Sequence, residues 1–309
     1  MPNHKPSRTG GLSGKAMLAV VLWGISFVLT REALETFNPF GLVTVRLLLG
    51  AAVLGLLGRL SGRALLPARS DRPTCIILGL VLAAHMLIQA HGLQHTSAIH
   101  TGWIIGLIPI PLALGAHLLG QQRIRPTGWI GITLGLVGVF IVTGSGMPEF
   151  ENARLGDALQ LVSCLTWTIY TLAGAGPASR SGALAVTLMA MIVATVVVAL
   201  ATAWTGAFVG PISAGPLMAT AILGLLCSGL ALYLWFDALV THGATRIGVL
   251  LYLEPFVTLV AAVLLGDERV TAGAFVGGLC VLAGAWQVAR GTSKPVHPKG
   301  TDRDPLDGE

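Results

Sequence analysis

Ten long apolar segments divide the chain, and their length constrains the fold more than any other feature of the sequence. A helix needs about 20 mostly apolar residues to cross the hydrocarbon core of a bilayer. Charged residues make up only 11% of the 309 residues, against about a quarter in soluble proteins. We therefore predict an all-α integral membrane protein with ten transmembrane helices. The segments lie near residues 16–34, 41–60, 74–93, 99–119, 126–143, 155–173, 184–204, 216–239, 246–266 and 271–289.

The net charge of +5 follows the membrane topology and does not indicate a nucleic-acid partner. With the N-terminus placed in the cytoplasm, the cytoplasmic side holds 15 of the 19 Lys and Arg residues, the opposite side holds 3, and Arg46 lies within a span. Positive residues remain cytoplasmic when helices insert, so both termini are expected inside. The excess of arginine over lysine (15 against 4) favours a bacterial source and hence the bacterial inner membrane, the cell membrane. The cytoplasmic set is Lys5, Arg8, Lys15, Arg59, Arg63, Arg69, Arg72, Arg123, Arg125, Arg180, Arg246, Arg290, Lys294, Lys299 and Arg303.

The two halves of the chain resemble each other at a constant offset of 146 residues. Residues 106–124 (GLIPIPLALGAHLLGQQRI) align with 252–270 (YLEPFVTLVAAVLLGDERV), and 14 of 58 positions in 86–143 are identical to those in 232–289 without a gap. Each half holds five spans, an odd number, so the second half enters the membrane from the opposite side. Such inverted repeats are typical of secondary transporters. The matching prolines, Pro109 and Pro255, are the candidate hinges, because interrupted spans mark the substrate site in these folds.

These residues also resemble a known family, the EamA family of the drug/metabolite transporter superfamily. The matching stretches are LWGISF (22–27), VRLLLGA (45–51), HTSAIHTGWIIGLIPIPLALGAHLLGQQR (95–123), WTIY (167–170) and LEPFVTLVAAVLLGDER (253–269). The resemblance implies ten helices in two inverted five-helix repeats around a central cavity, with the fifth and tenth helices to one side. The first repeat would cover 16–144 and the second 155–290. An external linker would span 145–154, a cytoplasmic tail 1–15 and a disordered cytoplasmic tail 291–309.

One position departs from the family pattern. Gln122 stands where a glutamate is usual, so only Glu268 of that pair is present. If the acid holds a helix end, the first half uses an amide for that purpose. The fifth and tenth spans also carry glycine stripes, which let helices approach closely within the protein or in a homodimer. The stripes are Gly128, Gly131, Gly135 and Gly138, and Gly273, Gly277 and Gly284.

Glu254 is the leading candidate for a substrate site. It lies in LLYLEPFVTLV (250–260) and is the only charged residue among the twenty between Arg246 and Asp267. An acidic side chain at this depth costs about 2.5–3.5 kcal/mol on insertion scales, so it faces a cavity or a partner. There it could bind a substrate amine or carry a proton, which leaves proton coupling open. The alternative is a structural carboxylate that bonds backbone groups where Pro255 cannot donate.

Aromatic and polar side chains at helical spacing supply candidate walls for the site. Trp and Tyr also anchor helices at the membrane interface, and this alternative applies to Trp167 and Tyr170. The histidine and glutamine candidates have a structural alternative as hydrogen-bonded core residues. Besides Glu254, the candidate substrate-binding residues are Trp23, Phe27, His85, Gln89, His100, Trp103, Trp167, Tyr170 and Tyr233. Arg46 matches the arginine of the family at this position and is interpreted as structural, with a side chain that can extend outward to the interface. Asp237 is expected to pair with Arg246 or to be solvated.

The sequence favours a secondary transporter, exporting amino acids or other small amphipathic metabolites. It contains no GxxxxGK[ST] motif, so the energy would come from gradients or exchange. The four cysteines are single and lack metal-ligand spacing, so we predict no metal, no cofactor and small core roles for them. A non-transporting scaffold or sensor is the alternative. An intramembrane enzyme is less favoured, because TGSGM (143–147) lies at a helix end with no base placed by the sequence.

Overall fold

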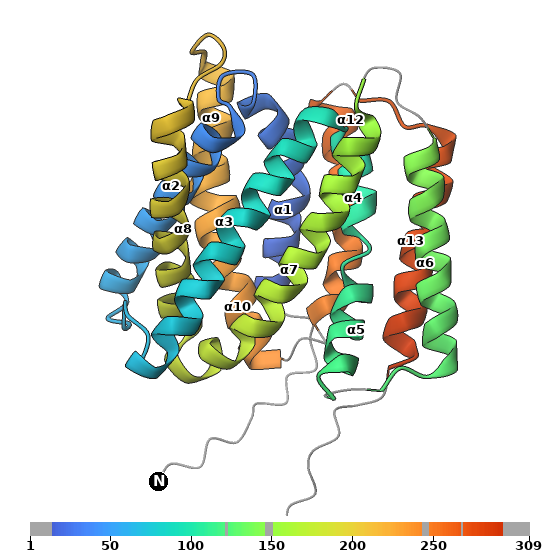
Figure 1. Ribbon diagram of the computed structural model, residues 1–309, viewed down its shortest axis with the longest axis horizontal. Coiled ribbons are helices and arrows are strands. Elements are labelled where there is room, and N and C mark those ends of the chain that lie inside the picture. Colours follow the sequence, from blue (N-terminus) through green and yellow to red (C-terminus); the bar gives the residue numbers. More distant parts are fainter. Residues whose placement is uncertain (1–13, 121–122, 146–150, 243–246, 267, 293–309) are drawn as a thin grey trace, which may run out of the picture.

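Helices make up nearly all of the described chain. The structure, a computed structural model, describes residues 14–120, 123–145, 151–242, 247–266 and 268–292, and within these ranges strand pairing is limited to isolated bridges. Seven helices are long and uninterrupted (Figure 1). They are α1 (Gly14–Ala33), α2 (Pro39–Leu60), α3 (Arg72–His95), α6 (Pro126–Gly144), α7 (Ala153–Ser181), α8 (Ala183–Thr205) and α13 (Ala272–Arg290).

Three further segments are helical but interrupted. The fourth consists of α4 (Ala98–Ile105) and α5 (Pro109–Leu118), and the ninth of a 3-10 turn (Val249–Leu253) and α12 (Glu254–Leu265). The eighth runs from α9 (Ala214–Ile222) through a π-helix (Leu223–Leu230) to α10 (Ala231–His242). Among the described residues, nine helical stretches have the length and hydropathy of membrane spans, and Leu250–Leu265 is a shorter apolar helix. These ten segments confirm the predicted all-α membrane fold.

Local sequence sets several helix starts. Asn38 caps α2, its Oδ1 accepting the Gly41 backbone N–H at 2.8 Å, and Pro39 follows at the first helical position. Ser97 caps α4 in the same way by accepting the backbone N–H of His100 at 3.0 Å. Such caps satisfy backbone donors that have no partner within the helix. The start of α4 is therefore fixed, and this matters below because α4 contributes to the central site.

The glycine stripes hold α6 and α13 together. The two helices lie next to each other at one lateral side of the bundle, on the right in Figure 1. A Cβ atom on Gly131 would lie 2.6 Å from the Gly284 carbonyl oxygen, and one on Gly138 would lie 2.6 Å from that of Gly277. Real side chains cannot fit at such distances, so only glycine allows this approach. The expected packing of the fifth and tenth spans is confirmed, and the stripes serve a contact within the chain.

The remaining helices surround the middle of the bundle. Helices α3 and α7 pack along each other, and α1 contacts both α10 and α12, while α4 lies against α7 and α12. Their facing sides form one large apolar core that contains most of the buried aromatic side chains. Helices α2 and α8 pack on α3 from the side away from α6 and α13. Each interrupted span packs against neighbouring helices, which can satisfy its freed backbone groups.

Candidate functional site

A small cavity lies at the centre of this core, where both interrupted proline-containing spans meet α1, α3 and α7. Its volume is about 40 Å³. At roughly 10–15 Å³ per water molecule, this is room for about three waters and not for a metabolite. The cavity of this structure is therefore too small to hold a substrate molecule. The lining residues are Trp23, Ser26, Phe27, Arg46, His85, Met86, Gln89, Ile105, Ile108, Trp167, Leu232 and Glu254.

The structure brings six of the ten substrate-binding candidates to this cavity and leaves four outside it. Those that line it are Trp23, Phe27, His85, Gln89, Trp167 and Glu254. Tyr170 is buried behind Trp167, with ring centroids 5.7 Å apart. Trp103 packs against Phe256 and Phe275 instead, and His100 belongs to a separate polar cluster. Tyr233 accepts a hydrogen bond from Arg63 on a part-exposed side of α10.

Both proline interruptions open onto the cavity. The residue before each proline, Ile108 in the first half and Glu254 in the second, lines it. Glu254 is 3% exposed, and its carboxylate has no hydrogen-bond partner among the described residues. Its backbone carbonyl accepts a bond from the Thr258 hydroxyl at 2.9 Å. The side chain therefore does not serve as the backbone cap that the alternative interpretation required, and its oxygens are available to the cavity.

Arg46 corrects a prediction. The sequence suggested that this side chain extends outward to the membrane interface, but the residue is 4% exposed and lines the cavity. Its Nε donates to the Ser228 hydroxyl at 2.7 Å and its Nη1 to the Thr30 hydroxyl at 3.4 Å. Within the described residues it has no carboxylate partner. Sequence position alone could not show this, because α1 and the π-helix enclose the side chain only in the folded bundle.

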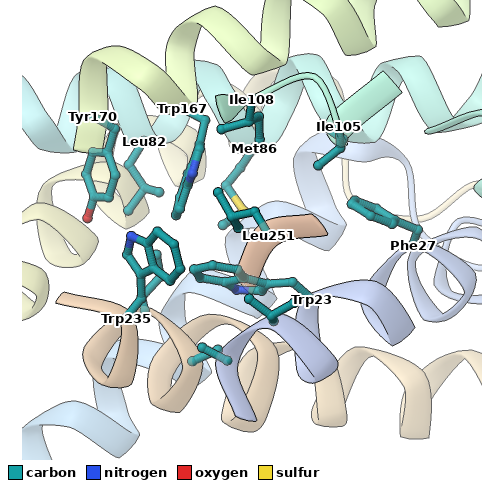
Figure 2. Packing of buried hydrophobic residues seen from close by; sticks show 14 of the residues in the cluster. Trp23, Phe27, Leu82, Met86, Ile105, Ile108, Trp167, Tyr170, Trp235 and Leu251 are labelled. Carbon is teal, nitrogen blue, oxygen red and sulfur yellow. The ribbon is translucent and has the colours of Figure 1, made fainter. Parts of the chain in front are cut away.

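An aromatic cluster closes one side of the cavity (Figure 2). The ring of Trp23 lies 5.0 Å from that of Trp167 and 5.3 Å from that of Trp235. Tyr170 and Phe236 extend the cluster, with centroids 5.4 Å apart. Trp167 and Tyr170 are only 5% and 1% exposed. They are therefore core residues, and the alternative of interfacial anchoring is wrong for both.

His85 is held in place by polar groups of α7. Its Nδ1 lies 3.0 Å from the Thr166 hydroxyl and 3.2 Å from the Ser163 carbonyl oxygen. On the same face of α7, the Gln160 side chain donates to the Gln89 carbonyl at 3.1 Å. The polar residues of α3 and α7 thus bond to each other across the interface between the two halves. The His85 side chain thus combines a structural contact with a position at the cavity wall. Gln89 also lines the cavity, but only its backbone carbonyl takes part in the contact with α7.

A larger, more polar vestibule of about 510 Å³ lies at one end of the bundle. We call this the Glu268 end, where α1 and α3 end and α4 and α7 begin. Glu268 forms an ion pair with Arg31, and its two oxygens accept the backbone N–H groups of Ala98 at 2.9 Å and Ile99 at 3.0 Å. The acid therefore holds the start of α4, as the sequence suggested. The counterpart Gln122 lies outside the described residues.

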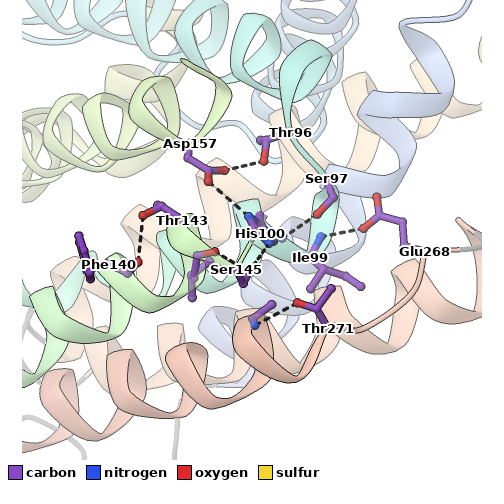
Figure 3. Close-up of polar contacts among 12 residues, drawn as sticks. Thr96, Ser97, Ile99, His100, Phe140, Thr143, Ser145, Asp157, Glu268 and Thr271 are labelled. Atoms are coloured by element: carbon purple, nitrogen blue, oxygen red, sulfur yellow. Dashed lines mark hydrogen bonds and ion pairs between the residues drawn. The ribbon is translucent and has the colours of Figure 1, made fainter. Parts of the chain in front are cut away.

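A Ser–His–Asp cluster lies at the same end (Figure 3), with His100 and Asp157 buried and Ser145 partly exposed. The Asp157 carboxylate lies 3.3 Å from Nδ1 of His100 and accepts the Thr96 hydroxyl at 2.5 Å. The Ser145 hydroxyl lies 3.3 Å from Nε2 of His100. The prediction that TGSGM has no positioned base is therefore wrong. No sequence pattern indicates this cluster, because His100 lies in α4, Asp157 in α7, and Ser145 directly after the end of α6. Ser145 itself donates to the Val142 carbonyl at 2.7 Å, which is a helix-end contact.

Charged contacts link the helices at the opposite end of the bundle. We call this the Asp71 end; α2 terminates and α3 begins here. Asp71 accepts hydrogen bonds from Arg180 at 2.5 Å and from the Ser181 hydroxyl at 2.6 Å. Asp237 pairs with Lys15 at 2.5 Å, linking α10 to α1. Its expected partner Arg246 lies outside the described residues. These contacts hold the helices together on the side of the cavity that the aromatic cluster closes.

The sequence as a whole matches a known family. A sequence model described as the EamA-like transporter family matches residues 14–144 and again residues 154–290. The chain belongs to the EamA-like transporter family. The resemblance seen in the sequence is thereby confirmed, and this EamA protein is a multi-span membrane transporter of the drug/metabolite type.

Several relatives of this EamA protein align over most of their length. An uncharacterized transporter of Archaeoglobus fulgidus is 25% identical over 276 residues, covering 87% of this chain and 94% of the relative. The "Probable amino-acid metabolite efflux pump" of Escherichia coli is 25% identical over 290 residues, covering 88% and 92%. A protein crystal structure aligns with a TM-score of 0.69 at 18% identity, covering 90% of this chain and 97% of that one. This last likeness concerns the fold alone.

Proposed function

We propose that this EamA protein is a secondary transporter that exports amino acids or small amphipathic metabolites across the cell membrane by alternating access. The observation that carries the proposal is the position of Glu254. An unpartnered carboxylate, 3% exposed, lies at a cavity where the proline-interrupted spans of both halves meet. In transporters of this type, substrates bind near the midplane at such interrupted helices. Ionisable groups within a membrane span are retained for function, because their burial is costly.

The packing of α6 on α13 supports two inverted repeats. The sequence offset of 146 carries Gly131 onto Gly277 and Gly138 onto Gly284. The contact between Gly131 and Gly284 therefore maps onto the contact between Gly277 and Gly138, and both contacts are present. A two-fold axis between the halves produces this exchange of partners. Inverted halves can rock against each other around a fixed site, with Pro109 and Pro255 as hinges.

The two ends of the bundle differ as an alternating-access cycle requires. The Glu268 end carries the vestibule of about 510 Å³. On the other side, the tryptophan cluster and the contacts of Asp71 and Asp237 tie the helices together. The distribution of Lys and Arg assigns the Asp71 end to the cytoplasm. The structure then corresponds to a state closed toward the cytoplasm, with its cavity contracted.

The chemistry of the walls supports the substrate class. Trp23, Phe27 and Trp167 offer apolar surface, and Glu254 offers an acceptor for an amine. A relative that covers nearly the same length carries the name of an amino-acid metabolite efflux pump. Proton movement through Glu254 would supply the driving force, because a carboxyl group can exchange a proton for a cationic substrate group.

Transport by purified full-length protein in liposomes tests the proposal. Liposomes loaded with a bacterial metabolite extract are diluted into buffer with and without an imposed pH gradient, and the released solutes are identified by mass spectrometry. We expect release of amino acids or similar metabolites above that of empty liposomes. Glu254→Gln should abolish the response to the pH gradient if this carboxyl group carries the proton. If no solute exchanges under any gradient, a scaffold or sensor role replaces the transporter.

The Ser145–His100–Asp157 cluster favours a second candidate, an acyl-transfer enzyme in which His100 activates the serine hydroxyl. The 3.3 Å distance from Ser145 Oγ to His100 Nε2 is long for that role, and the hydroxyl already donates to Val142. A fluorophosphonate probe, which modifies activated serines, decides between the two roles. Labelling that disappears in Ser145→Ala would support the enzyme, and absence of labelling would leave the cluster as a helix-end contact.

A further inference from the structure

The central cavity contains one basic and one acidic side chain that do not neutralise each other. Arg46 comes from α2 and Glu254 from the start of α12, and both line the cavity. They form no ion pair with each other. Both residues are at least nine-tenths buried, at 4% and 3% exposed. A basic and an acidic side chain enclosed in one small space are therefore available to a third group.

The hydrogen bonds of Arg46 leave most of its donors unused. A guanidinium has five N–H groups, and the structure gives acceptors to one on Nε and one on Nη1, from Ser228 and Thr30. Both acceptors are neutral hydroxyls. They fix the orientation of the planar group without compensating its charge. Arginine in such a fixed position is well suited to bind a carboxylate through two parallel hydrogen bonds.

We propose that Arg46 and Glu254 together make this transporter selective for zwitterions, with Arg46 binding the carboxylate and Glu254 the ammonium group of the substrate. The inference rests on the proposed transport function and specifies its substrate class. A simple amine would leave Arg46 uncompensated and repelled, and a simple carboxylate would face Glu254. Only a molecule that carries both charges satisfies both residues, because specificity arises from penalties on the wrong ligand as well as contacts with the right one.

The remaining walls suit an apolar substituent. Phe27, Met86 and Trp167 line the same cavity as the two ionisable residues. Met86 has a flexible side chain that can repack around ligands of different shape. Because the contracted cavity of about 40 Å³ admits only water, binding of a zwitterion must expand it. The two charges therefore act when the halves separate enough to admit the substrate.

Matched analogues test the proposal on the full-length protein in detergent and in liposomes. The panel consists of the common α-amino acids and two longer zwitterions, β-alanine and γ-aminobutyrate. Each α-amino acid is accompanied by its methyl ester, which lacks the carboxylate, and its N-acetyl derivative, which lacks the ammonium group. Binding is measured by thermal stabilisation and transport by release from liposomes. We expect at least one zwitterion to bind, and both of its derivatives to bind on the order of 10- to 100-fold more weakly, the range for a lost charged hydrogen bond.

Two variants test which residue binds which charged group of the substrate. Arg46→Gln should weaken binding of the zwitterion on the order of 10- to 100-fold. It should not weaken the methyl ester, which has no carboxylate to lose and whose ammonium group is no longer repelled by Arg46. Glu254→Gln should weaken the zwitterion and spare the N-acetyl derivative. Binding of the spared derivative that is equal to or stronger than in the unmodified protein also shows that each variant is folded. Arg46→Lys should recover part of the affinity, and Arg59→Gln, an exposed arginine of the same helix, is the matched control.

The outcomes separate this inference from the transport function. Equal binding of zwitterions and their derivatives would overturn the inference, and so would transport of other solutes without binding of any zwitterion. In both cases the transporter proposal would stand if solute release from liposomes is observed. If neither the panel nor a metabolite extract is released, the transporter proposal fails as well.

Discussion

Trp23 and Trp167 meet edge to face at the boundary between the two halves of the protein. Their ring centroids are 5.0 Å apart and the ring planes are 80° from each other. The indole N–H of Trp23 donates to the Cys227 carbonyl at 3.0 Å. The indole N–H of Trp167 is buried and has no acceptor among the described residues. Two tryptophans of similar environment therefore differ in one hydrogen bond.

The first prediction uses this difference. Trp23→Phe and Trp167→Phe remove the same atoms, but only the first breaks a hydrogen bond and leaves a buried carbonyl group with one partner fewer. We expect Trp23→Phe to be less stable than Trp167→Phe by about 0.5–1.5 kcal/mol, the net value of a hydrogen bond. Thermal unfolding in detergent measures this difference. Transport by the two variants then shows whether the free N–H of Trp167 serves the substrate, since in that case Trp167→Phe should lower the rate more than Trp23→Phe although it is the more stable variant.

The second prediction concerns the ion pair of Glu268 with Arg31. Glu268→Gln removes the charge and one of the two acceptors for the backbone N–H groups of Ala98 and Ile99. Hydrogen bonds to charged groups contribute about 1.5–3 kcal/mol, so a loss of stability in this range is expected. Hydrogen exchange of the first turn of α4 should accelerate as well. Glu32→Gln, an exposed acid in the same vestibule, serves as the control and should leave both measurements unchanged.

A third prediction concerns the contact of α6 with α13. A Cβ at Gly138 would lie 2.5 Å from the Val281 nitrogen, whereas one at Gly144 meets no atom within 4 Å. Gly138→Leu forces the helices apart and should destabilise the protein by at least about 1–3 kcal/mol, the range for overpacking. Gly144→Leu, in the same helix, should have little effect. Similar melting temperatures for both variants would contradict the observed helix packing.

The fourth prediction tests the orientation. The loop at 61–72 is expected in the cytoplasm and the linker at 145–154 outside. Ala64→Cys and Glu151→Cys, both exposed, are introduced one at a time into a variant in which Cys280 is serine. The other three cysteines are buried. An impermeant maleimide applied to intact cells should label Glu151→Cys only. Labelling of Ala64→Cys from outside would reverse the assignment of the two ends.

The sequence predicted the spans and several wall residues for a physical reason. In lipid, an apolar run of helix length has few alternatives, so the ten segments follow directly from hydropathy. A lone acid in the middle of a span must face a cavity or a partner, and this argument predicted that Glu254 lines a cavity. The same argument applies to polar and aromatic residues at helical spacing in α3 and α7, such as Gln89 and Trp167. Burying a polar group in lipid is costly, and the spacing puts these side chains on one face of the helix.

The remaining parts of the site depend on contacts between distant segments. Arg46 near a span end is equally compatible with an interfacial and a buried position, and only the packing of α1 and the π-helix decides. His100 meets Asp157 across 57 residues, and no periodic pattern connects them. Trp103 shares the aromatic chemistry of Trp23 but lies on the side of α4 that faces α12 and α13. The type of residue was thus enough to predict that a side chain is buried. The neighbours that it contacts could be known only from the folded structure.

The small volume of the cavity has a consequence for the membrane that contains the protein. An open aqueous path would dissipate the ion gradients and metabolite pools that a cell maintains, even if each molecule conducted only briefly. With about 40 Å³ at its centre and tightly packed tryptophan rings on one side, this state offers no continuous column of water. We therefore expect the protein in this state to act as an electrical and chemical insulator. Large amounts of it can be present without a leak, and the rate of leakage from liposomes sets an upper limit on how often both ends open together.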